Sequence, residues 1–319
     1  MKRILTVLAA TLIAGGACAQ GAWPAKPIRM VVPFTAGSVT DIIGRTVAEA
    51  MGKSLGQPVI VENKPGAGGT IGAAQVARSE PDGHTVLVHS SGHALNPAIY
   101  PGLPYDTVKD LTGVTPLAAV PNVLVVSPAR GWKSVQDVIA AAKARPGQMN
   151  YASAGTGSAT HMNAEKFKLK AGIEAQHVPF KGTPEAITDV IGGRNDWFFA
   201  PLASALPLIR DGKLQALAVS SARRSPALPE VPTTVEAGVS GSEYTLWVGM
   251  IVPSATPPAV LRRLHEEAVK ALNAPEVKAR LASLGADALP MEPAAFNAYI
   301  KAEMESAAQI ARTANLKAQ

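Results

Sequence analysis

The stretches VVPFTAGSVTD (residues 31–41) and NYASAGTGSATH (residues 150–161) share one pattern in different halves of the chain. In each, an apolar strand-like run leads into a loop of Gly, Ser, Ala and Thr and then into a helix-like segment. Small residues at a helix start let an anion approach the unpaired backbone amides. In open α/β sheets, ligands bind where the carboxyl end of a strand meets such a loop. The pattern predicts an α/β fold with two anion-binding loops; the alternative is that both are ordinary turns.

The sequence around these stretches alternates between short apolar runs and helical patterns, as in βαβ units around a mostly parallel sheet. The alternation continues to TVLVHSS (85–91), restarts at NVLVVSP (122–128), and ends at LQALAVSS (214–221). In the second unit, Ser134 begins a capping-box-like helix start. We therefore expect two α/β units, each with its own sheet.

The tail after residue 244 has a strand pattern at 245–253, and helical patterns at 258–273, 275–284 and 293–315. The last helix carries an apolar stripe, which is predicted to pack on the first unit. The stripe is formed by Phe296, Ile300, Met304 and Ala307 or Ala308.

These patterns predict two lobes joined by two crossing segments, near PNVLVV (121–126) and EYTLWV (243–248). Domain 1 would comprise residues 20–123 and 246–319, and domain 2 residues 124–245. The two anion loops would then face each other across one cleft. Such an arrangement suits a molecule with two carboxylates.

The first 19 residues have the features of a secretory signal peptide. Lys2 and Arg3 precede an apolar run, and Ala17-Cys18-Ala19 forms an A-x-A cleavage site. We expect cleavage after Ala19 and export of the mature chain. Lipidation of Cys18 is the alternative, although Gly15 stands where a lipoprotein signal needs an apolar residue.

The formal net charge of +6 is spread along the chain without clustered Lys/Arg runs, and aromatic residues make up 5% of it. This composition argues against a nucleic-acid partner. After the signal, no apolar run reaches the roughly 18 residues of a membrane helix. The mature protein is therefore expected to be soluble.

Motifs for catalysis or cofactors match only in part. GKSLG (52–56) fits G-x-S-x-G by letter, but it closes a helix where a nucleophile elbow needs a preceding strand. GAGG (66–69) has the setting of a dinucleotide loop, but Ile71 stands where the last glycine is needed. His89 and His93 have metal-like spacing at a strand end, where i and i+4 do not meet. We expect no cofactor and no metal; an exported hydrolase using Ser or His stays the alternative function.

The chain resembles the Bug family, the TctC-like periplasmic solute-binding receptors of tripartite tricarboxylate transporters. The resemblance runs through an ordered set of segments over nearly all of the mature chain. They include WPAKPIRMVVPFTAGSVTDIIGR (23–45), LGQPVIVENKPGAGGTIGA (55–73), NYASAGTGSATH (150–161), HVPFKGTPEAITDVIGG (177–193) and LPEVPTTVEAG (228–238).

The resemblance implies a two-lobed periplasmic binding protein, a type II-like flytrap that closes on a small carboxylate and delivers it to membrane transporter subunits. It implies a periplasmic, non-enzymatic monomer. The loop Pro33–Ser38 would hold one carboxylate through backbone amides and ordered waters, and the loop Ser153–His161 the other end. A dicarboxylate or an aromatic carboxylate is expected.

Three positions depart from the family pattern. Thr35 stands where Pro is frequent, Ser38 where Gly is usual, and Ala200 where many relatives have an Asp suited to a ligand ammonium. An amino-acid ligand is therefore not expected. His161 is a candidate ligand donor, with helix capping as the alternative. The predicted ligand-binding residues are Phe34, Thr35, Ala36, Gly37, Ser38, Asp41, Ser91, Ser153, Gly155, Thr156, Ser158, His161, Phe180, Lys181 and Ala200.

Overall fold

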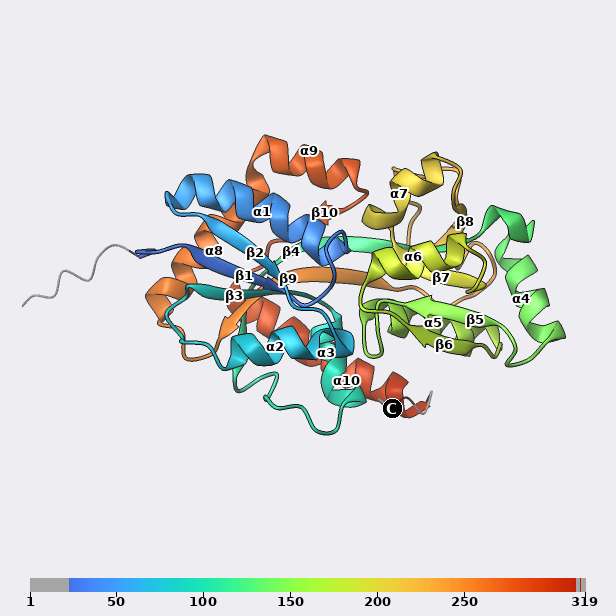
Figure 1. Ribbon diagram of the computed structural model, residues 1–319, viewed down its shortest axis with the longest axis horizontal. Coiled ribbons are helices and arrows are strands. Elements are labelled where there is room, and N and C mark those ends of the chain that lie inside the picture. Colours follow the sequence, from blue (N-terminus) through green and yellow to red (C-terminus); the bar gives the residue numbers. More distant parts are fainter. Residues whose placement is uncertain (1–22, 314–315, 317–319) are drawn as a thin grey trace, which may run out of the picture.

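The computed structural model describes residues 23–313 and 316, so the predicted signal peptide lies outside the described residues. The chain forms two α/β lobes side by side along the longest axis of the molecule (Figure 1). No helix of the described residues is long and apolar enough to cross a membrane.

The first lobe is built on a mixed sheet with the strand order β2-β1-β3-β9-β4. β1 pairs in parallel with β2 and β3, whereas β9 runs antiparallel to both of its neighbours, and β10 adds antiparallel to β4. The strands are β1 (Ile28–Val32), β2 (Val59–Asn63), β3 (Thr85–Ser90), β4 (Leu111–Val126), β9 (Thr245–Pro253) and β10 (Asp287–Ala288).

Helices cover both faces of this sheet (Figure 1). α1, α8 and α9 share one apolar cluster with the sheet, and α2, α3 and α10 share another. The helices are α1 (Val39–Leu55), α2 (Thr70–Ala77), preceded by the 3₁₀ turn η1 (Ala67–Gly69), α3 (Gly92–Ile99), α8 (Pro258–Asn273), α9 (Pro275–Ser283) and α10 (Pro293–Thr313).

The second lobe has the strand order β4-β7-β5-β6, with β8 also paired to β4. β5 is parallel to β6 and β7, whereas β7 and β8 are antiparallel to β4. Its elements are η2 (Pro128–Arg130), α4 (Val135–Ala144), β5 (Asn150–Ser153), α5 (Ala159–Ala171), β6 (Gln176–Pro179), α6 (Thr183–Ile191), β7 (Trp197–Pro201), α7 (Leu202–Arg210) and β8 (Gln215–Val219).

The long strand β4 runs through both lobes. Up to Pro121 it pairs with β9 of the first lobe, and from Asn122 onward it pairs with β7 and β8 of the second. The chain returns just before β9, where Tyr244 donates its backbone N–H to Ser220. These are the two segments that the sequence predicts as crossings.

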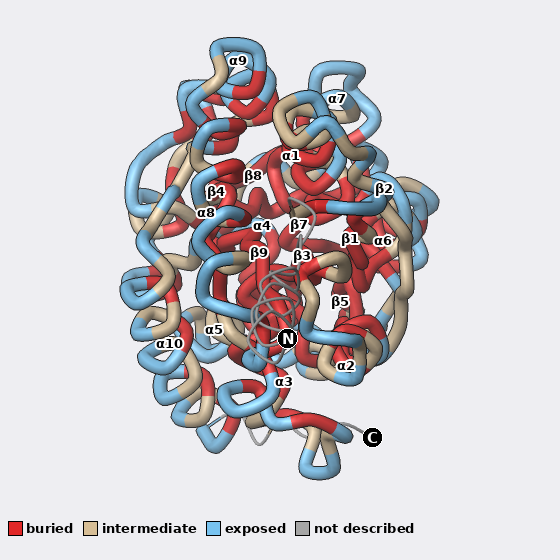
Figure 2. The backbone as a smooth tube through the Cα atoms, turned by 90° about the vertical axis from the view of Figure 1, so that its left-hand side faces the viewer, coloured by how far each residue is buried: buried red, intermediate tan, exposed pale blue. Residues whose placement is uncertain are grey.

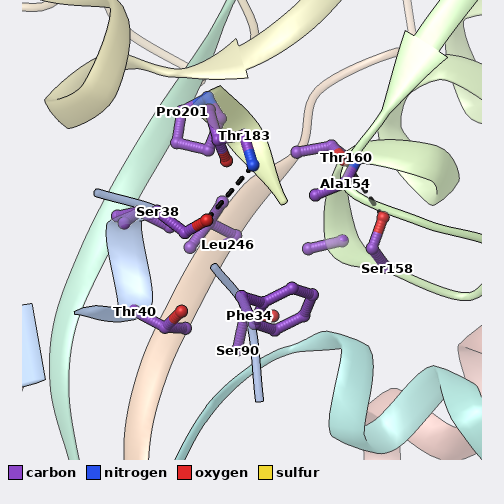
Figure 3. Close-up of a pocket in the computed structure, with 12 residues that line it drawn as sticks. Phe34, Ser38, Thr40, Ser90, Ala154, Ser158, Thr160, Thr183, Pro201 and Leu246 are labelled. Carbon is purple, nitrogen blue, oxygen red and sulfur yellow. Dashed lines mark hydrogen bonds between the residues drawn. The ribbon is translucent and has the colours of Figure 1, made fainter. Parts of the chain in front are cut away.

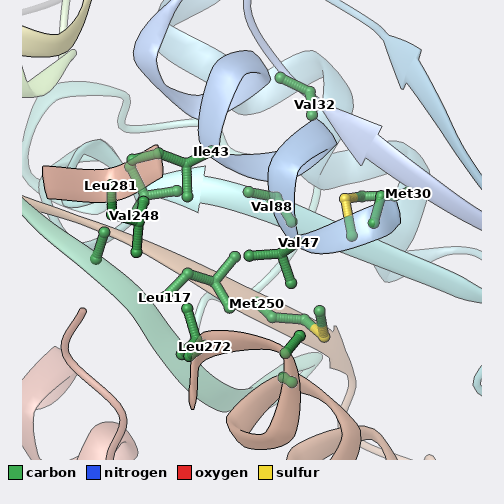
Figure 4. Close-up of a cluster of buried hydrophobic side chains, with 14 of the residues drawn as sticks. Met30, Val32, Ile43, Val47, Val88, Leu117, Val248, Met250, Leu272 and Leu281 are labelled. Atoms are coloured by element: carbon green, nitrogen blue, oxygen red, sulfur yellow. The ribbon is translucent and has the colours of Figure 1, made fainter. Parts of the chain in front are cut away.

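The core lies on the faces of the two sheets, with the exposed residues outside them (Figure 2). Between α1, the first sheet and the C-terminal helices, apolar side chains pack without solvent exposure (Figure 4). Burying each such Val, Ile, Leu or Met side chain contributes about 1.5–3 kcal/mol. The cluster includes Met30, Ile43, Val47, Val88, Leu117, Val248, Met250 and Leu272.

Several local predictions are confirmed. Ser134 and Asp137 form the capping box of α4, and α8 spans Pro258–Asn273. The stripe of α10 packs on the first lobe through Phe296 and Ile300. The antiparallel placement of β9 departs from the mostly parallel sheets expected, because strand direction depends on pairing between segments far apart in the sequence.

Candidate functional site

A cavity of about 20 Å³ lies between the lobes (Figure 3). A volume of this size admits about one water molecule. From the first lobe it is lined by Phe34, Ser38, Val39, Thr40, Ser90 and Leu246, and from the second by Ala154, Ser158, Ala159, Thr160, Thr183 and Pro201. Both predicted anion loops, or the helix starts that follow them, therefore reach one site.

Three helices begin at this cavity. Ser38 is the N-cap of α1 and Ser158 the N-cap of α5, and both line it together with Thr183, the first residue of α6. The first amides of a helix have no partner within the helix and carry partial positive charge. Since the lining residues include no Lys, Arg, Asp or Glu, the attraction for an anion comes from backbone and hydroxyl groups.

Asp41 stabilises the conformation of the first loop through hydrogen bonds. Its carboxylate accepts hydrogen bonds from the Gly37 amide (2.9 Å), Arg45 Nε (3.0 Å) and Asn63 Nδ2 (2.9 Å). Burial raises the pKa of Asp41, but hydrogen bonds from Arg45, Gly37 and Asn63 outweigh it and hold the pKa below its usual value. In this structure the oxygens of Asp41 are engaged within the protein and Asp41 does not line the cavity, so its assignment to the ligand stays a prediction.

The second loop is held by a hydroxyl pair. Ser158 Oγ accepts from the His161 amide (3.3 Å), Thr160 Oγ1 accepts from the Ala154 amide (2.9 Å), and the two hydroxyls are 3.0 Å apart. One of the two hydroxyl hydrogens is used between them, so the other is free to donate. The second-lobe side of the cavity therefore offers a hydroxyl hydrogen-bond donor to a ligand.

A stack of rings supports the second loop from inside the lobe. His161 and His177 stack with ring centroids 4.0 Å apart, and Tyr151 stacks on His177 at 5.0 Å. Burial, together with Lys168, lowers the pKa of His161 to about 4, and burial and then His161 lower the pKa of His177 to about 3. His161 Nδ1 accepts from the Gly157 amide (3.2 Å), so His161 braces the loop and does not line the cavity.

Ser153 also lies behind the loop. It is fully buried, and its Oγ lies 2.6 Å from His177 Nε2 and accepts from the Gly155 amide (3.0 Å). The Ser153–His177 pair has the residue types of a nucleophile and its base. Because Ser153 is covered and absent from the cavity wall, the pair fixes the loop conformation.

The other predicted ligand-binding residues differ in whether they line the cavity. Phe34, Ser38 and Ser158 line it, whereas Ala36, Gly37 and Lys181 are exposed. Thr35 and Gly155 face the opposite lobe, and the Thr156 carbonyl accepts from Tyr100 OH (2.8 Å). Ser91 Oγ lies 3.1 Å from Tyr244 OH, and Phe180 packs against the apolar core of the second lobe.

Ala200 is fully buried in the apolar cluster of the second lobe and pairs with Val123 of β4. Its neighbour Pro201 is the β7 residue that lines the cavity. In this structure Pro201 and not Ala200 lines the cavity, because successive side chains of a strand point to opposite faces; a ligand contact of Ala200 stays a prediction.

Sequence reasoning missed nine lining residues: Val39, Thr40, Ser90, Ala154, Ala159, Thr160, Thr183, Pro201 and Leu246. One signal could have found two of them, since both loops end in Ser-x-Thr, which places Thr40 and Thr160 at the same position of the first helical turn. Thr183, Pro201 and Leu246 come from other segments and depend on the tertiary fold.

His89 and His93 are both buried, with ring centroids 5.5 Å apart. Within residues 23–313 and 316, no group of three His, Cys, Asp or Glu residues is placed to hold a metal ion. A side chain at Gly69 would collide with His89, so this part of the glycine-rich stretch packs closely against the imidazole.

Comparison with known proteins agrees with this architecture. Residues 43–316 match the TctC family, the tripartite tricarboxylate transporter family receptors. The chain is 34% identical to protein BugT of Bordetella pertussis over 99% of each chain. It superposes on an R. palustris protein solved with adipate (TM-score 0.90, 32% identity, covering 93% of this chain and 100% of that one). It also superposes on MatC from Rhodopseudomonas palustris with bound malate (TM-score 0.86, 32% identity, 90% and 99%).

The fold and the interlobe site define a two-lobed α/β solute-binding protein. The chain belongs to the TctC family, and it is a periplasmic solute-binding receptor of the Bug type. The alternative of a hydrolase is set aside, because the family to which the chain belongs consists of transporter receptors and not of enzymes.

Proposed function

We propose that this receptor captures a small dicarboxylate between its lobes and delivers it, as a monomer, to membrane subunits of a tripartite tricarboxylate transporter. The observation that carries the proposal is the convergence of the α1, α5 and α6 N-termini on one cavity without a charged side chain in its wall. Each lobe would hold one carboxylate through first-turn amides and hydroxyls.

The wall of the cavity also indicates what lies between the two carboxylates. Phe34, Leu246 and Pro201 are apolar, and no acidic side chain is present to pair with an ammonium group. An amino group buried there would lose its hydration without compensation. A plain or hydroxylated dicarboxylate therefore fits better than aspartate or glutamate.

The cavity of about 20 Å³ is far below the roughly 300 Å³ or more of typical ligand pockets. The lobes must therefore move apart to admit a ligand, and the side chains that line the cavity must make room for it when the lobes close again. The structure corresponds to a closed arrangement, in which groups of the two lobes are directly hydrogen-bonded.

Calorimetric titration with succinate, glutarate, adipate, malate, aspartate and glutamate tests the proposal. At least one plain or hydroxylated dicarboxylate should bind at about micromolar affinity, and the amino acids should bind at least tenfold more weakly. Ser158→Ala should weaken the binding of that dicarboxylate about tenfold, because it removes a cavity hydroxyl and the α5 cap. Preferential binding of aspartate or glutamate would contradict the proposed ligand class.

A further inference from the structure

The first loop contacts the second lobe directly at helix α6. The Thr183 amide donates to Ser38 Oγ (3.1 Å) in a buried hydrogen bond (Figure 3). Two residues farther along the helix, Thr35 Oγ1 donates to Glu185 Oε2 (2.9 Å) in an exposed one. Both hydroxyls therefore reach across the boundary between the lobes.

Helix α6 has no side-chain cap from its own segment. Its N-cap residue is Gly182, which has no side chain, and Pro184 in the first turn has no N–H. Ser38 Oγ accepts the Thr183 amide at this helix start and so acts as a cap supplied by the other lobe. The approach is close: a Cβ at Gly182 would lie 1.9 Å from Thr35 Oγ1 and 2.7 Å from Ser38 Oγ.

Ser38 is available for this contact because it does not cap its own helix. It is the N-cap residue of α1, yet its side chain makes no cap hydrogen bond there. As the Oγ accepts from Thr183, the hydroxyl hydrogen stays free to donate into the cavity that Ser38 lines. One hydroxyl can thus bind a ligand oxygen and the opposite lobe together.

We propose that Ser38 and Thr35 couple ligand binding to closure by capping α6 from the opposite lobe. This inference rests on the proposed function, since it needs a ligand held between lobes that open and close. The two hydrogen bonds exist only when the lobes are together. They therefore stabilise the closed state by the difference in free energy between these bonds and the hydrogen bonds that the same groups make with water in the open state. Ser38 binds both the ligand and the second lobe. Thr35 and Glu185 stabilise the closed arrangement through their hydrogen bond and do not line the cavity.

The test combines binding and ligand-free shape. Ser38→Ala should weaken binding of adipate or malate about tenfold and enlarge the ligand-free radius of gyration measured by scattering, because a buried amide loses its partner only in the closed state. If Ser38 were only a ligand contact, binding would weaken while the ligand-free dimensions stayed those of the unmodified protein. That result would overturn the proposal.

A double-mutant cycle on Thr35→Val and Glu185→Ala tests coupling away from the cavity. Each variant should weaken binding about threefold, and the double variant no more than either alone. Additive losses, or no loss, would overturn the role of Thr35. Thr46→Val is the matched control, since this α1 hydroxyl donates to the Ile42 carbonyl within its own helix and should change affinity less than about twofold.

Two further outcomes keep the proposals apart. If Ser38→Ala fails to fold by circular dichroism, the Thr35–Glu185 cycle decides. If the unmodified protein binds none of the dicarboxylates or amino acids tested above, the proposed function is contradicted. The radius of gyration of ligand-free Ser38→Ala, or of Thr35→Val, then tests the interlobe contact by itself. A value above that of the unmodified protein supports the contact, and an equal value overturns it.

Discussion

Thr40 has a buried hydroxyl at the wall of the cavity. It is 1% exposed, it lines the cavity, and its Oγ1 has no hydrogen-bond partner within the described residues. A buried hydroxyl without a partner costs free energy, which a ligand oxygen in the cavity would recover. The Thr40 hydroxyl is therefore a candidate partner for a ligand oxygen.

We predict that Thr40→Val separates stability from binding. Valine has nearly the same shape and needs no hydrogen bond, so the free energy of unfolding should stay within about 1 kcal/mol of its original value or rise. Affinity for the bound dicarboxylate should fall about tenfold. Denaturant unfolding and calorimetric titration measure the two effects, with Thr46→Val as the control. An unchanged affinity would show that Thr40 does not meet the ligand.

Individual residues also mark how far sequence reasoning can identify the site. The position of the two loops was predictable because Gly, Ser and Thr after a strand are typical of a strand–loop–helix turn. Ser38 and Ser158 line the cavity, and their contact with a ligand stays a prediction. Asp41 belongs to the first of these stretches, and in the structure its carboxylate accepts from Arg45, its i+4 neighbour on α1, and from Asn63, which comes near it only in the folded chain. Pro201 and Leu246 have no local signal and were found only through the fold.

The strand–loop–helix units were predictable from the sequence, whereas the pairing of β9 was not. The boundaries of α8 and the stripe of α10 follow from hydrophobic periodicity and a proline at the helix start. β9 lies between β3 and β4 although about 120 residues separate it from β4 in sequence. No local pattern specifies such a partner, because strand propensity reflects packing against neighbours.

The ring stack between β5, β6 and α5 predicts how stability depends on pH. His161 and His177 have pKa values lowered to about 4 and about 3, and burial also lowers the pKa of His89 to about 4. Between pH 6.5 and about 4, the unfolded chain takes up protons at these positions and the folded chain does not. Stability should therefore be retained above pH 6.5 and fall as the pH is lowered through this window.

In that window each such histidine lowers the free energy of unfolding by up to about 1.4 kcal/mol for each pH unit by which the pH falls. Chemical denaturation at pH 7, 6, 5 and 4.5 measures the slope. His177→Gln should make the slope shallower, since it removes one of the groups that titrate only on unfolding. A free energy of unfolding that stays constant from pH 6.5 to 4.5 would contradict the neutral buried stack.

The glycine-rich turn η1 meets the second loop across the lobe boundary. A Cβ at Gly68 would lie 2.1 Å from the Thr156 carbonyl oxygen, and Gly68 has φ +59°. Gly68→Ala should therefore obstruct closure and weaken ligand binding more than about tenfold. Gly56→Ala is the matched control, because Gly56 has a similar φ of +68° and nothing within 4 Å. If Gly68→Ala and Gly56→Ala weakened ligand binding equally, the loss of affinity would come from backbone strain alone.

Two crossing segments connect the lobes. β4 changes its sheet partners between Pro121 and Asn122, and the return segment is tied to the second lobe through Tyr244 and Ser220. We propose that the two lobes, which the sequence analysis expects to be formed by residues 20–123 with 246–319 and by residues 124–245, move as two domains about these segments. Two adjacent connections allow bending while they restrict twist.

The same arrangement predicts a ligand-dependent change of shape without a change of fold. A dicarboxylate that touches both loops gains contacts in the closed state that the open state lacks, so it shifts the population toward closure. The radius of gyration should decrease when the ligand identified by titration saturates the protein, while far-ultraviolet circular dichroism stays constant, because each sheet and its core remain intact. Gly68→Ala should show a smaller decrease at saturation, since its added methyl group meets the Thr156 carbonyl before the lobes are fully together. A saturated protein with the dimensions of the free one would indicate a rigid site, and the cavity of about 20 Å³ would then have to enlarge by rearrangement of its loops alone.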